Sequence, residues 1–471
     1  MNVVFLCPNV PHPPLNGGQH RNLRLIRSLA RFASVHVFAI GDPRGERARR
    51  AEAELTGPGL AWSVFAPTGP GRAEADEEDT DRPPDAAAHF RSSELADTLV
   101  RHFETRRVDV AHVEEVVMAQ YVDRLPCPRV IDRQKVDWAY HEEMAQVVSG
   151  PGPALAHLRE ARRFRAWERR LVGAFDQMLV PGEGDRRLLE PLHGPGIVSV
   201  VPIGIGDELT PPAVRPPHVD HVLLFGARDY GPNVEGEGWF FREVWPGLRR
   251  RAPQLRALVV GSGRPPLRAS PPPADASVEV RGFVPDIVSV LQGPGVLVVP
   301  VRVGGGARTK VLEALACGLP VVSTTPGVEN LGLVAGRDFL RADTAEETIE
   351  AVTRLVGDPD LARSLGRAGA ARAEAFRWSA IETALEPIYR QAAAGRYASA
   401  RNASGQRRDT PWTPPPEIAH LQEELIAREK GRPFPFVARS ARRWRRTALG
   451  RRLEAATARW IDRLAFLRGR S

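Results

Sequence analysis

The sequence has few of the residues that mark several protein classes. Cysteine occurs only three times among 471 residues, as Cys7, Cys127 and Cys317. A small and scattered set of this kind excludes both a disulfide framework and a cysteine-based zinc site. The lack of disulfides is typical of a protein in a reducing compartment.

Long hydrophobic runs are also missing. No stretch of about 18 apolar residues occurs, so we expect no membrane-spanning helix. The first apolar run, residues 2–7, has no basic stretch before it, so a signal peptide is not expected. These absences predict a cytoplasmic location.

A net positive charge is missing from most of the chain, although the whole sequence carries a net charge of +8. Residues 437–471 hold eleven arginines against Glu454 and Asp462, a net charge of +9, which leaves the first 436 residues at about −1. A neutral body argues against nucleic acid as the main partner.

Short apolar runs alternate with runs of helical periodicity along the first 392 residues. This alternation predicts a parallel α/β sheet with right-handed crossovers. The pattern begins again near residue 221, so we expect two Rossmann-like domains that face a central cleft. The expected strands are 2–7, 34–41, 108–114, 129–132 and 177–182, then 221–227, 255–263, 277–284, 295–303 and 321–324. The expected helices are 21–32 and 155–175, then 238–250, 308–317 and 378–391.

Composition sets the domain boundaries. The first domain is predicted at 1–210 and the second at 218–392, with the proline-rich segment 211–217 as a hinge. Residues 393–436 are predicted to be a linker that precedes the basic segment 437–471. The acidic, proline-rich residues 67–87 are predicted to form a mobile loop.

A glycine-rich turn joins a predicted strand to a predicted helix within 301–327, which reads VRVGGGARTKVLEALACGLPVVSTTPG. Glycine allows close approach of the backbone, and the free N–H groups at a helix start hold anions. Gly17 and Gly18 lie at the matching place in the first half. Two such turns suggest a ligand with phosphate groups, although each alone is compatible with a plain turn.

Lysine is rare, with only Lys135, Lys310 and Lys430 among 65 basic residues. A lysine next to the glycine-rich turn suggests a need for a compact ammonium group. The alternative is an i,i+3 ion pair between Lys310 and Glu313 on a solvated helix face, worth roughly 0.2–0.5 kcal/mol.

Several motifs in order resemble those of group 1 (family 4) retaining glycosyltransferases, which have the GT-B fold. They are 304–324, with a GGGxRxKxLEAxAxGxPVV pattern, VVPIGIG at 200–206, LLFGARDYGPN at 223–233, VVGSG at 259–263 and VRGFVPDI at 280–287. The bacterial exopolysaccharide sugar transferases show the greatest similarity. The resemblance covers most of residues 1–392.

The resemblance implies a nucleotide-sugar donor and assigns a role to each matching residue. Glu313 would accept both ribose hydroxyls in a bidentate pair, while Arg308 and Lys310 would stabilise the leaving diphosphate as the catalytic cations. The remaining donor contacts implied are Gly17, Gly18, Arg228, Asn233, Gly282, Val284, Gly305 and Gly306.

Three positions depart from the family pattern. Asn233 stands where the family has a lysine. Gly305 occupies the place of the first glutamate in the family's Glu-x7-Glu motif, and Gln134 lies near the place of a donor-contacting histidine. Glu114, Glu115 and Asp132 follow predicted strands and are candidates to position the acceptor. Ordinary surface or capping carboxylates are the alternative for all three.

The resemblance implies a retaining, hexosyl-type transferase that moves sugar to a glycan or lipid-linked acceptor in cell-surface polysaccharide synthesis. It implies no metal and no other cofactor, because amides and basic side chains stabilise the diphosphate. Asp79 and Asp81 lie in the acidic, proline-rich segment with no strand before them, so we expect a solvated loop there and not a metal site. A nucleotide-sugar epimerase and a non-catalytic glycan-binding scaffold of the same fold remain the alternatives.

The basic segment 437–471 has its own pattern. Leu449, Leu453, Trp460 and Leu464 recur at helical spacing, with arginines between them. A basic amphipathic helix of this kind suits an anionic membrane surface, which would place the protein at the inner face of the cell membrane. The alternative is a helix that packs on the protein or on a partner.

Overall fold

The computed structural model describes residues 1–68, 84–148, 150–216, 218–263, 272–303 and 308–395. Its contacts divide the chain into two units. The first, Met1–Ser149 with Ala156–Gly405, contains both β-sheets; the second consists of Gly150–Leu155 with Gln406–Ser471. The predicted linker and basic segment, 393–436 and 437–471, lie outside the described residues except for 393–395.

Seven parallel strands form the first sheet, in the order β3-β2-β1-β4-β5-β6-β7. They are β1 Asn2–Cys7, β2 Ser34–Ile40, β3 Leu60–Phe65, β4 Val110–Glu114, β5 Arg129–Asp132, β6 Gln177–Val180 and β7 Val198–Val200. Their runs of apolar, often β-branched residues are buried on both faces of the sheet, as a parallel sheet covered by helices requires.

Helices connect these strands. They are α1 Gly17–Leu29, α2 Glu46–Leu55, α3 Asp85–Ala88, α4 Ser93–Thr105, α5 Glu115–Met118, the 3-10 helix η1 Ala119–Arg124, α6 Asp137–Val147, α7 Pro151–Arg170 and α8 Glu183–His193. Asn16 begins α1, where its side chain accepts a hydrogen bond from the Gln19 amide at 3.0 Å. This cap fixes the turn that holds Gly17 and Gly18.

The second sheet has six parallel strands, in the order β10-β9-β8-β11-β12-β13. They are β8 His221–Phe225, β9 Arg256–Val260, β10 Val278–Gly282, β11 Gly295–Val299, β12 Val321–Ser323 and β13 Leu340–Arg341. Around them lie α9 Gly231–Trp239, the π-helical turn η2 Phe240–Val244, α10 Trp245–Arg251, α11 Ile287–Leu291, α12 Thr309–Ala316, η3 Pro326–Val328, α13 Ala345–Gly357, α14 Pro359–Ala373 and η4 Glu374–Phe376. The two predicted Rossmann-like domains are thus confirmed.

Strand order reverses once in each sheet, between β1 and β4 and between β8 and β11. Open α/β sheets bind ligands at the carboxyl ends of the strands beside such a reversal. The segments at these two places are the β1–α1 turn, the residues after β4, the β8–α9 turn and the β11–α12 turn. All four contain residues that the sequence singled out.

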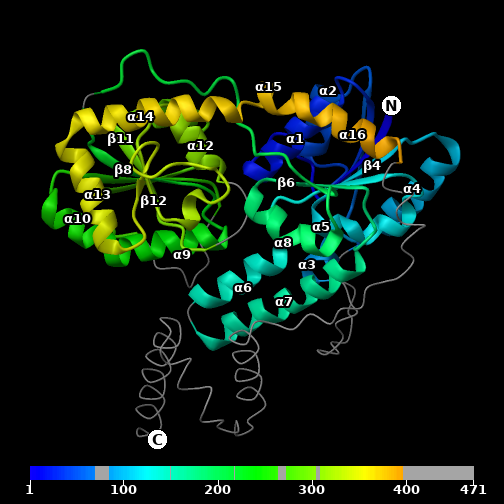
Figure 1. The fold of residues 1–471 in the computed structure, drawn as a ribbon, viewed down its shortest axis with the longest axis horizontal. Coiled ribbons are helices and arrows are strands. Elements are labelled where there is room, and N and C mark those ends of the chain that lie inside the picture. The colour runs from blue at the N-terminus through cyan, green and yellow to red at the C-terminus, as the bar shows by residue number, and fades with distance from the viewer. Residues whose placement is uncertain (69–83, 149, 217, 264–271, 304–307, 396–471) are drawn as a thin grey trace, which may run out of the picture. The chain divides into compact units, whose positions relative to one another are not determined.

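The C-terminal helices return to the first sheet, although they begin before residue 392, the predicted end of the second domain. They are α15 Trp378–Ile381, the 3-10 turn η5 Glu382–Ala384 and α16 Leu385–Ala393. Their apolar side chains share a buried cluster with β1 and β2, and α16 lies beside α1 (Figure 1). Tyr389 forms a hydrogen bond with the ring of His112 on β4 at 2.5 Å.

The chain passes between the domains twice, first near Ile205 and again near residues 376–378. Backbone hydrogen bonds join these two crossings. Ile205 donates its amide to the Phe376 carbonyl at 2.8 Å and accepts from the Trp378 amide at 3.2 Å. A Cβ on Gly204 would lie 2.5 Å from the Trp378 ring. This contact explains a glycine of the VVPIGIG motif, because no side chain fits there.

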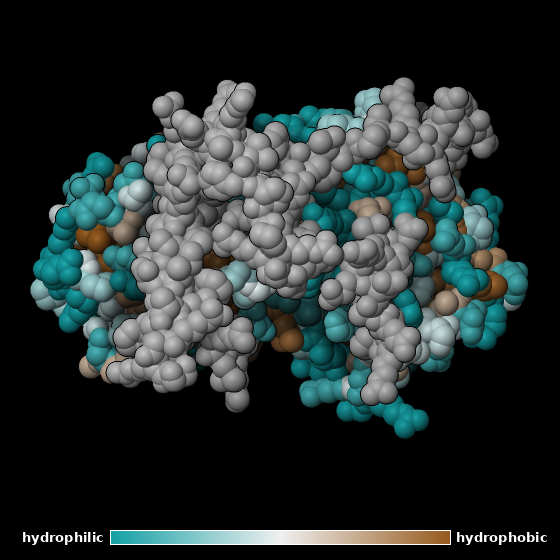
Figure 2. Space-filling view, turned by 90° about the horizontal axis from the view of Figure 1, so that it is seen from below, coloured by the Kyte–Doolittle hydropathy of each residue, from teal (hydrophilic) through white to brown (hydrophobic). Residues whose placement is uncertain are grey.

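The exposed surface is polar for the most part. On the face seen in Figure 2, the described residues are mainly hydrophilic, and the hydrophobic ones form separate spots. Single exposed apolar side chains are normal on a folded protein. Among the helices of the described residues, none combines the length and the apolar composition that crossing a bilayer requires.

Candidate functional site

Gly17 and Gly18 begin α1 at a place where the chain is tightly enclosed. A Cβ on Gly17 would lie 2.6 Å from Oγ1 of Thr309, the first residue of α12. A Cβ on Gly18 would lie 2.3 Å from Oε1 of Gln134. The backbone at the start of α1, in the first domain, therefore contacts the side chain that begins α12, in the second domain. Thr309 follows the glycine-rich turn of the second half, whose glycines lie outside the described residues.

Lys310 reaches from α12 to the β8–α9 turn. Its ammonium donates to Oδ1 of Asn233 at 2.6 Å, and Nδ2 of Asn233 donates to the carbonyl of Ala227 at 2.8 Å. Burial, with the charge of Arg308 as a second cause, lowers the pKa of Lys310 to about 7. The ammonium is thus held beside the turn but lacks a carboxylate at hydrogen-bond distance among the described residues.

Glu313 lies one turn further along α12 and is half-buried. Burial, followed by the nearby charge of Glu208, raises the pKa of Glu313 to about 7, while Lys310 opposes the shift. In the part of the chain that the structure describes, no group donates a hydrogen bond to this carboxylate. Its oxygens are therefore available to a ligand. The simple i,i+3 ion pair with Lys310 is not formed, because the lysine is bonded to Asn233 instead.

The two arginines of this edge are held by the protein. Arg228 forms a two-point pair with Glu237, at 2.7 and 3.3 Å, and Glu237 lies on α9. Arg308 is buried, and its Nε donates to the carbonyl of Pro326 at 3.3 Å. Both side chains are thus ordered before any ligand arrives.

Gly282 and Val284, which we expect beside the nucleobase, lie at the end of strand β10 and just after it. Gly282 has a φ of +63°, a backbone conformation that favours glycine, and its carbonyl accepts from the Gly261 amide at 2.8 Å. Val284 is half-buried, and Phe283 between them is 62% exposed. Gly305 and Gly306 lie outside the described residues.

Asp132 has a structural role that the sequence did not predict. Both of its oxygens accept from the guanidinium of Arg21 at 2.7 Å, and both side chains are buried. Arg21 also donates to the carbonyl of Pro202 at 2.9 Å. The pair fastens α1 to β5 and to the first crossing. Because Asp132 is fully buried and both of its oxygens are bonded to Arg21, we do not propose that it positions the sugar acceptor.

Glu114 is also buried, at the end of β4. One oxygen lies 3.1 Å from the ring of His112, and the other accepts from Gln134 at 2.7 Å. Burial is the main cause that raises the pKa of Glu114 well above its usual value. Gln134, which the sequence placed near a donor-contacting histidine, thus orders the carboxylate beneath the β1–α1 turn.

Glu115 differs from its neighbour in being half-buried and strained. Its φ is +63°, a conformation that a residue with a side chain adopts at a cost and that is frequent at functional sites. Its Oε2 is buried with no partner among the described residues, and burial raises its pKa to about 7. Lys135, whose charge opposes that shift, donates to Asp137 at 2.6 Å. Glu115 is therefore the acceptor candidate whose geometry fits best.

Two contacts between the domains lie near this edge, and the sequence indicated neither. The rings of Tyr140 and Tyr230 stack with centroids 6.2 Å apart. Asn330 has a φ of +65°, accepts from the Gly184 amide at 2.8 Å and donates to Asp185 at 2.9 Å. Their partners are about 90 or more positions apart, so local pattern carries no signal for them.

No group of three or more potential metal ligands occurs within the described ranges. Asp79 and Asp81 lie outside those ranges.

Comparison with known proteins finds a family similarity within the second domain. Residues 220–358 match the family model described as glycosyl transferases group 1. The D-inositol 3-phosphate glycosyltransferase of Corynebacterium jeikeium is 25% identical to this chain over 303 residues, which cover 58% of this chain and 71% of that protein.

Solved structures show the same fold as both domains together. The sucrose-phosphate synthase of Thermosynechococcus elongatus matches with a TM-score of 0.61 at 18% identity, over 84% of this chain and all of that one. HepE from Anabaena, in complex with UDP-glucose, matches with a TM-score of 0.56 at 15% identity, over 82% and 99% of the two chains. The GT-B fold predicted from the sequence is thus confirmed.

The Arg21–Asp132 pair gives a stability prediction. Asp132→Asn should lower the free energy of unfolding by about 3–5 kcal/mol, because it leaves a buried guanidinium without its counter-charge. Urea unfolding followed by circular dichroism measures the change.

Glu386→Gln is the matched control, since Glu386 pairs with Arg390 on the exposed face of α16. It should cost less than about 0.5 kcal/mol. Equal unfolding midpoints for the two variants would show that the buried pair does not fasten α1.

Proposed function

We propose that the protein transfers a sugar from a nucleotide-sugar donor to a glycan or lipid-linked acceptor, with retention of the anomeric configuration. The observation that carries this proposal is the convergence of Lys310, Asn233 and Glu313 at the carboxyl edge of a domain that matches the group 1 glycosyl transferases. HepE in complex with UDP-glucose supports a nucleotide-sugar donor for this fold.

Lys310 and Arg308 stabilise the departing diphosphate in this proposal. When the bond between the anomeric carbon and the phosphate oxygen breaks, the electron pair stays on that oxygen. Cations that are already fixed beside it lower the barrier, since they need no reorganisation at that moment. Asn233 holds the ammonium of Lys310 in place, which accounts for an amide at the position where the family has a lysine.

Glu313 binds the ribose in this proposal. Two adjacent hydroxyls can each donate to one carboxylate oxygen, and no described residue competes for these oxygens. Gly17 and Gly18 supply backbone from the first domain, at the start of α1. Gly282 and Val284 provide a backbone edge for the nucleobase.

Glu115 is proposed to orient the acceptor hydroxyl, supported by the buried Glu114. The acceptor oxygen forms the new bond to the anomeric carbon as the bond to the diphosphate breaks, and its proton passes to the departing diphosphate oxygen. We assign no protein nucleophile. The basic segment 437–471 would hold the enzyme at an anionic membrane, where a lipid-linked acceptor resides, as in polysaccharide synthesis at the cell surface.

Glu313→Gln tests the donor site. It should bind nucleotide sugars about 10- to 100-fold more weakly, because a charged acceptor of two hydrogen bonds becomes a neutral amide. Isothermal titration against a panel of UDP- and GDP-sugars measures this, after thermal shift has identified the donor.

Glu350→Gln is the matched control, because Glu350 is exposed on α13 in the same domain. It should bind the donor as the unaltered protein does. Equal affinity of Glu313→Gln and Glu350→Gln would overturn the ribose assignment.

Donor affinity should depend on pH with a maximum near pH 7. Above pH 7, Lys310 loses its proton in the free protein and must regain it to pair with the diphosphate, so affinity falls as pH rises. Below pH 7, the Glu313 carboxyl must lose a proton to accept both hydroxyls, so affinity falls as pH drops.

Titration at pH 6, 7 and 8 with an intact nucleotide sugar measures this profile. Lys310→Met should remove the fall on the alkaline side, and Glu313→Gln the fall on the acid side. A profile that neither variant changes would show that these two groups do not titrate on binding.

The transfer itself is tested by release of nucleoside diphosphate from the donor, with and without a membrane lipid extract. A transferase requires the acceptor for release. An epimerase would change the sugar without release, and a scaffold would do neither.

Deletion of 437–471 belongs to the same assay. Release with vesicle-borne acceptor should fall and sedimentation with anionic vesicles should be lost, while donor affinity should stay unchanged. Unchanged sedimentation would refute the membrane role and leave the transferase proposal intact.

A further inference from the structure

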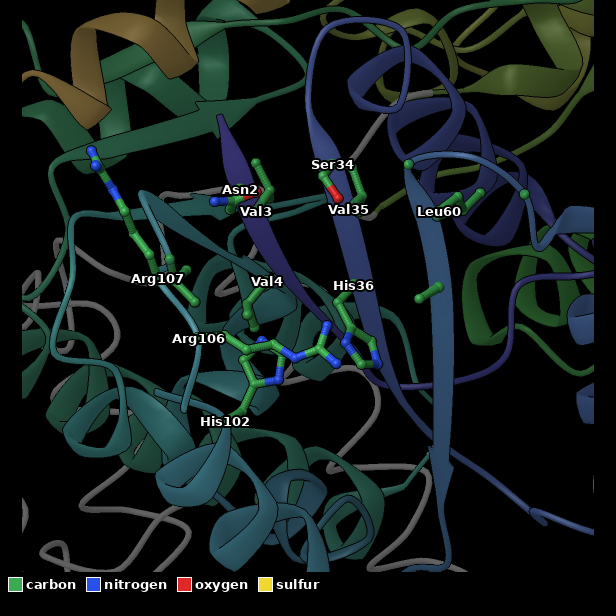
Figure 3. A pocket seen from close by; sticks show the side chains of 14 residues that line it. Asn2, Val3, Val4, Ser34, Val35, His36, Leu60, His102, Arg106 and Arg107 are labelled. Atoms are coloured by element: carbon green, nitrogen blue, oxygen red, sulfur yellow. The ribbon is translucent and has the colours of Figure 1, made fainter. Parts of the chain in front are cut away.

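A cavity lies at the amino edge of the first sheet, where β1, β2 and β3 begin, opposite the edge that carries the donor residues. Its volume is about 450 Å³, within the range of small-molecule sites. Connecting helices of a parallel sheet run opposite to the strands, so the end of α4 closes this cavity (Figure 3). Val4, Ala61 and Val108 form an apolar part of its wall. The cavity is therefore separate from the carboxyl edge where the donor residues gather.

The polar side of the cavity carries positive charge without a counter-charge. Arg106 is exposed, and no carboxylate lies within ion-pair distance of it in the described part of the chain. Arg107, in contrast, pairs with Asp109 at 3.0 Å. Figure 3 shows Arg106 extended toward His36 with His102 beside it, while Arg107 points away. Arg106 is thus the charged group directed into the cavity.

Two histidines flank this arginine. The rings of His36 and His102 are 5.1 Å apart and nearly perpendicular. Burial, followed by the neighbouring histidine and Arg106, lowers the pKa of His36 to about 4. Burial and Arg106 also lower the pKa of His102. Burial is the main cause of both pKa shifts, and the charge of Arg106 adds to it, so protonation of either ring is disfavoured.

We propose that this cavity binds a small phosphorylated molecule, with its phosphate on Arg106 and His102 and its apolar body against Ala61 and Val108. A phosphomonoester carries nearly two negative charges at neutral pH and has three acceptor oxygens. A guanidinium and an imidazole side by side match two of those oxygens. A carboxylate carries only one negative charge and two acceptor oxygens, so it matches the guanidinium less well than a phosphate does.

The ring of His36 takes a different part. Its Nε2 is 2.9 Å from the hydroxyl of Ser63 on β3, and its Nδ1 is buried without a described partner. His36 therefore forms the floor beneath Arg106 and reports on ligands through its ring protons. The site needs no residue of the donor edge, so it stands independently of the proposed transferase activity.

Proton NMR of the histidine rings, with phenyl phosphate as the probe, tests the site directly. Saturable shifts of the His36 and His102 ring signals are expected, and Arg106→Ala should weaken binding at least about tenfold through loss of the charged partner. Arg124→Ala is the matched control, because Arg124 is exposed in the same domain with no ion pair among the described residues. It should leave the titration unchanged.

Two comparisons narrow the ligand class. Benzoate should bind more weakly than phenyl phosphate, and inorganic phosphate should bind more weakly because it lacks the apolar body. Equal binding of phenyl phosphate by Arg106→Ala and the unaltered protein, or ring signals that do not move at millimolar probe, would overturn the proposal. Tighter binding of benzoate would overturn the phosphate assignment.

Discussion

The buried ion pair between Arg21 and Asp132 is the interaction on which the donor edge depends. It joins α1 to β5, and through the carbonyl of Pro202 it also holds the first crossing between the domains. A guanidinium that is fully desolvated is tolerable only with this complete set of acceptors. With α1 fixed in this way, Gly17 at its start lies against Thr309 of the second domain, and Gly18 lies against Gln134.

The charged side chains at the donor edge fall into two groups, according to whether other side chains of the protein neutralise and hydrogen-bond them. Arg228 and Asp132 have complete sets of partners, so they order the backbone and other side chains. Lys310, Glu313 and Glu115 are only partly compensated, and burial moves each of their pKa values to about 7. Incompletely satisfied groups of this kind are costly in a folded protein and cluster where ligands complete them. The first group thus supports the second.

The sequence predicted most of the strands, because their signals are local, but it missed the strands β3, β7 and β13. Apolar runs of strand length and the helical spacing after Arg308 depend only on neighbours along the chain. The return of α15 and α16 to the first sheet was missed, since Leu385 and Tyr389 show a helix but not which sheet it covers. The partners of Asn330 and Tyr230 were missed for the same reason. Gln134 was placed at the right edge by resemblance, whereas its bond to Glu114 required coordinates.

The paired crossings have a mechanical consequence. Ile205 bonds to both Phe376 and Trp378, so the two links between the domains are tied to each other rather than placed at separate corners. Two domains joined along one such seam, the hydrogen-bonded pair of crossings, can rotate about it as about a hinge. They resist sliding and twisting relative to each other. Rotation of this kind would move Thr309 away from Gly17 and leave the seam intact. Entry of a large co-substrate and its later departure could then share a single degree of freedom.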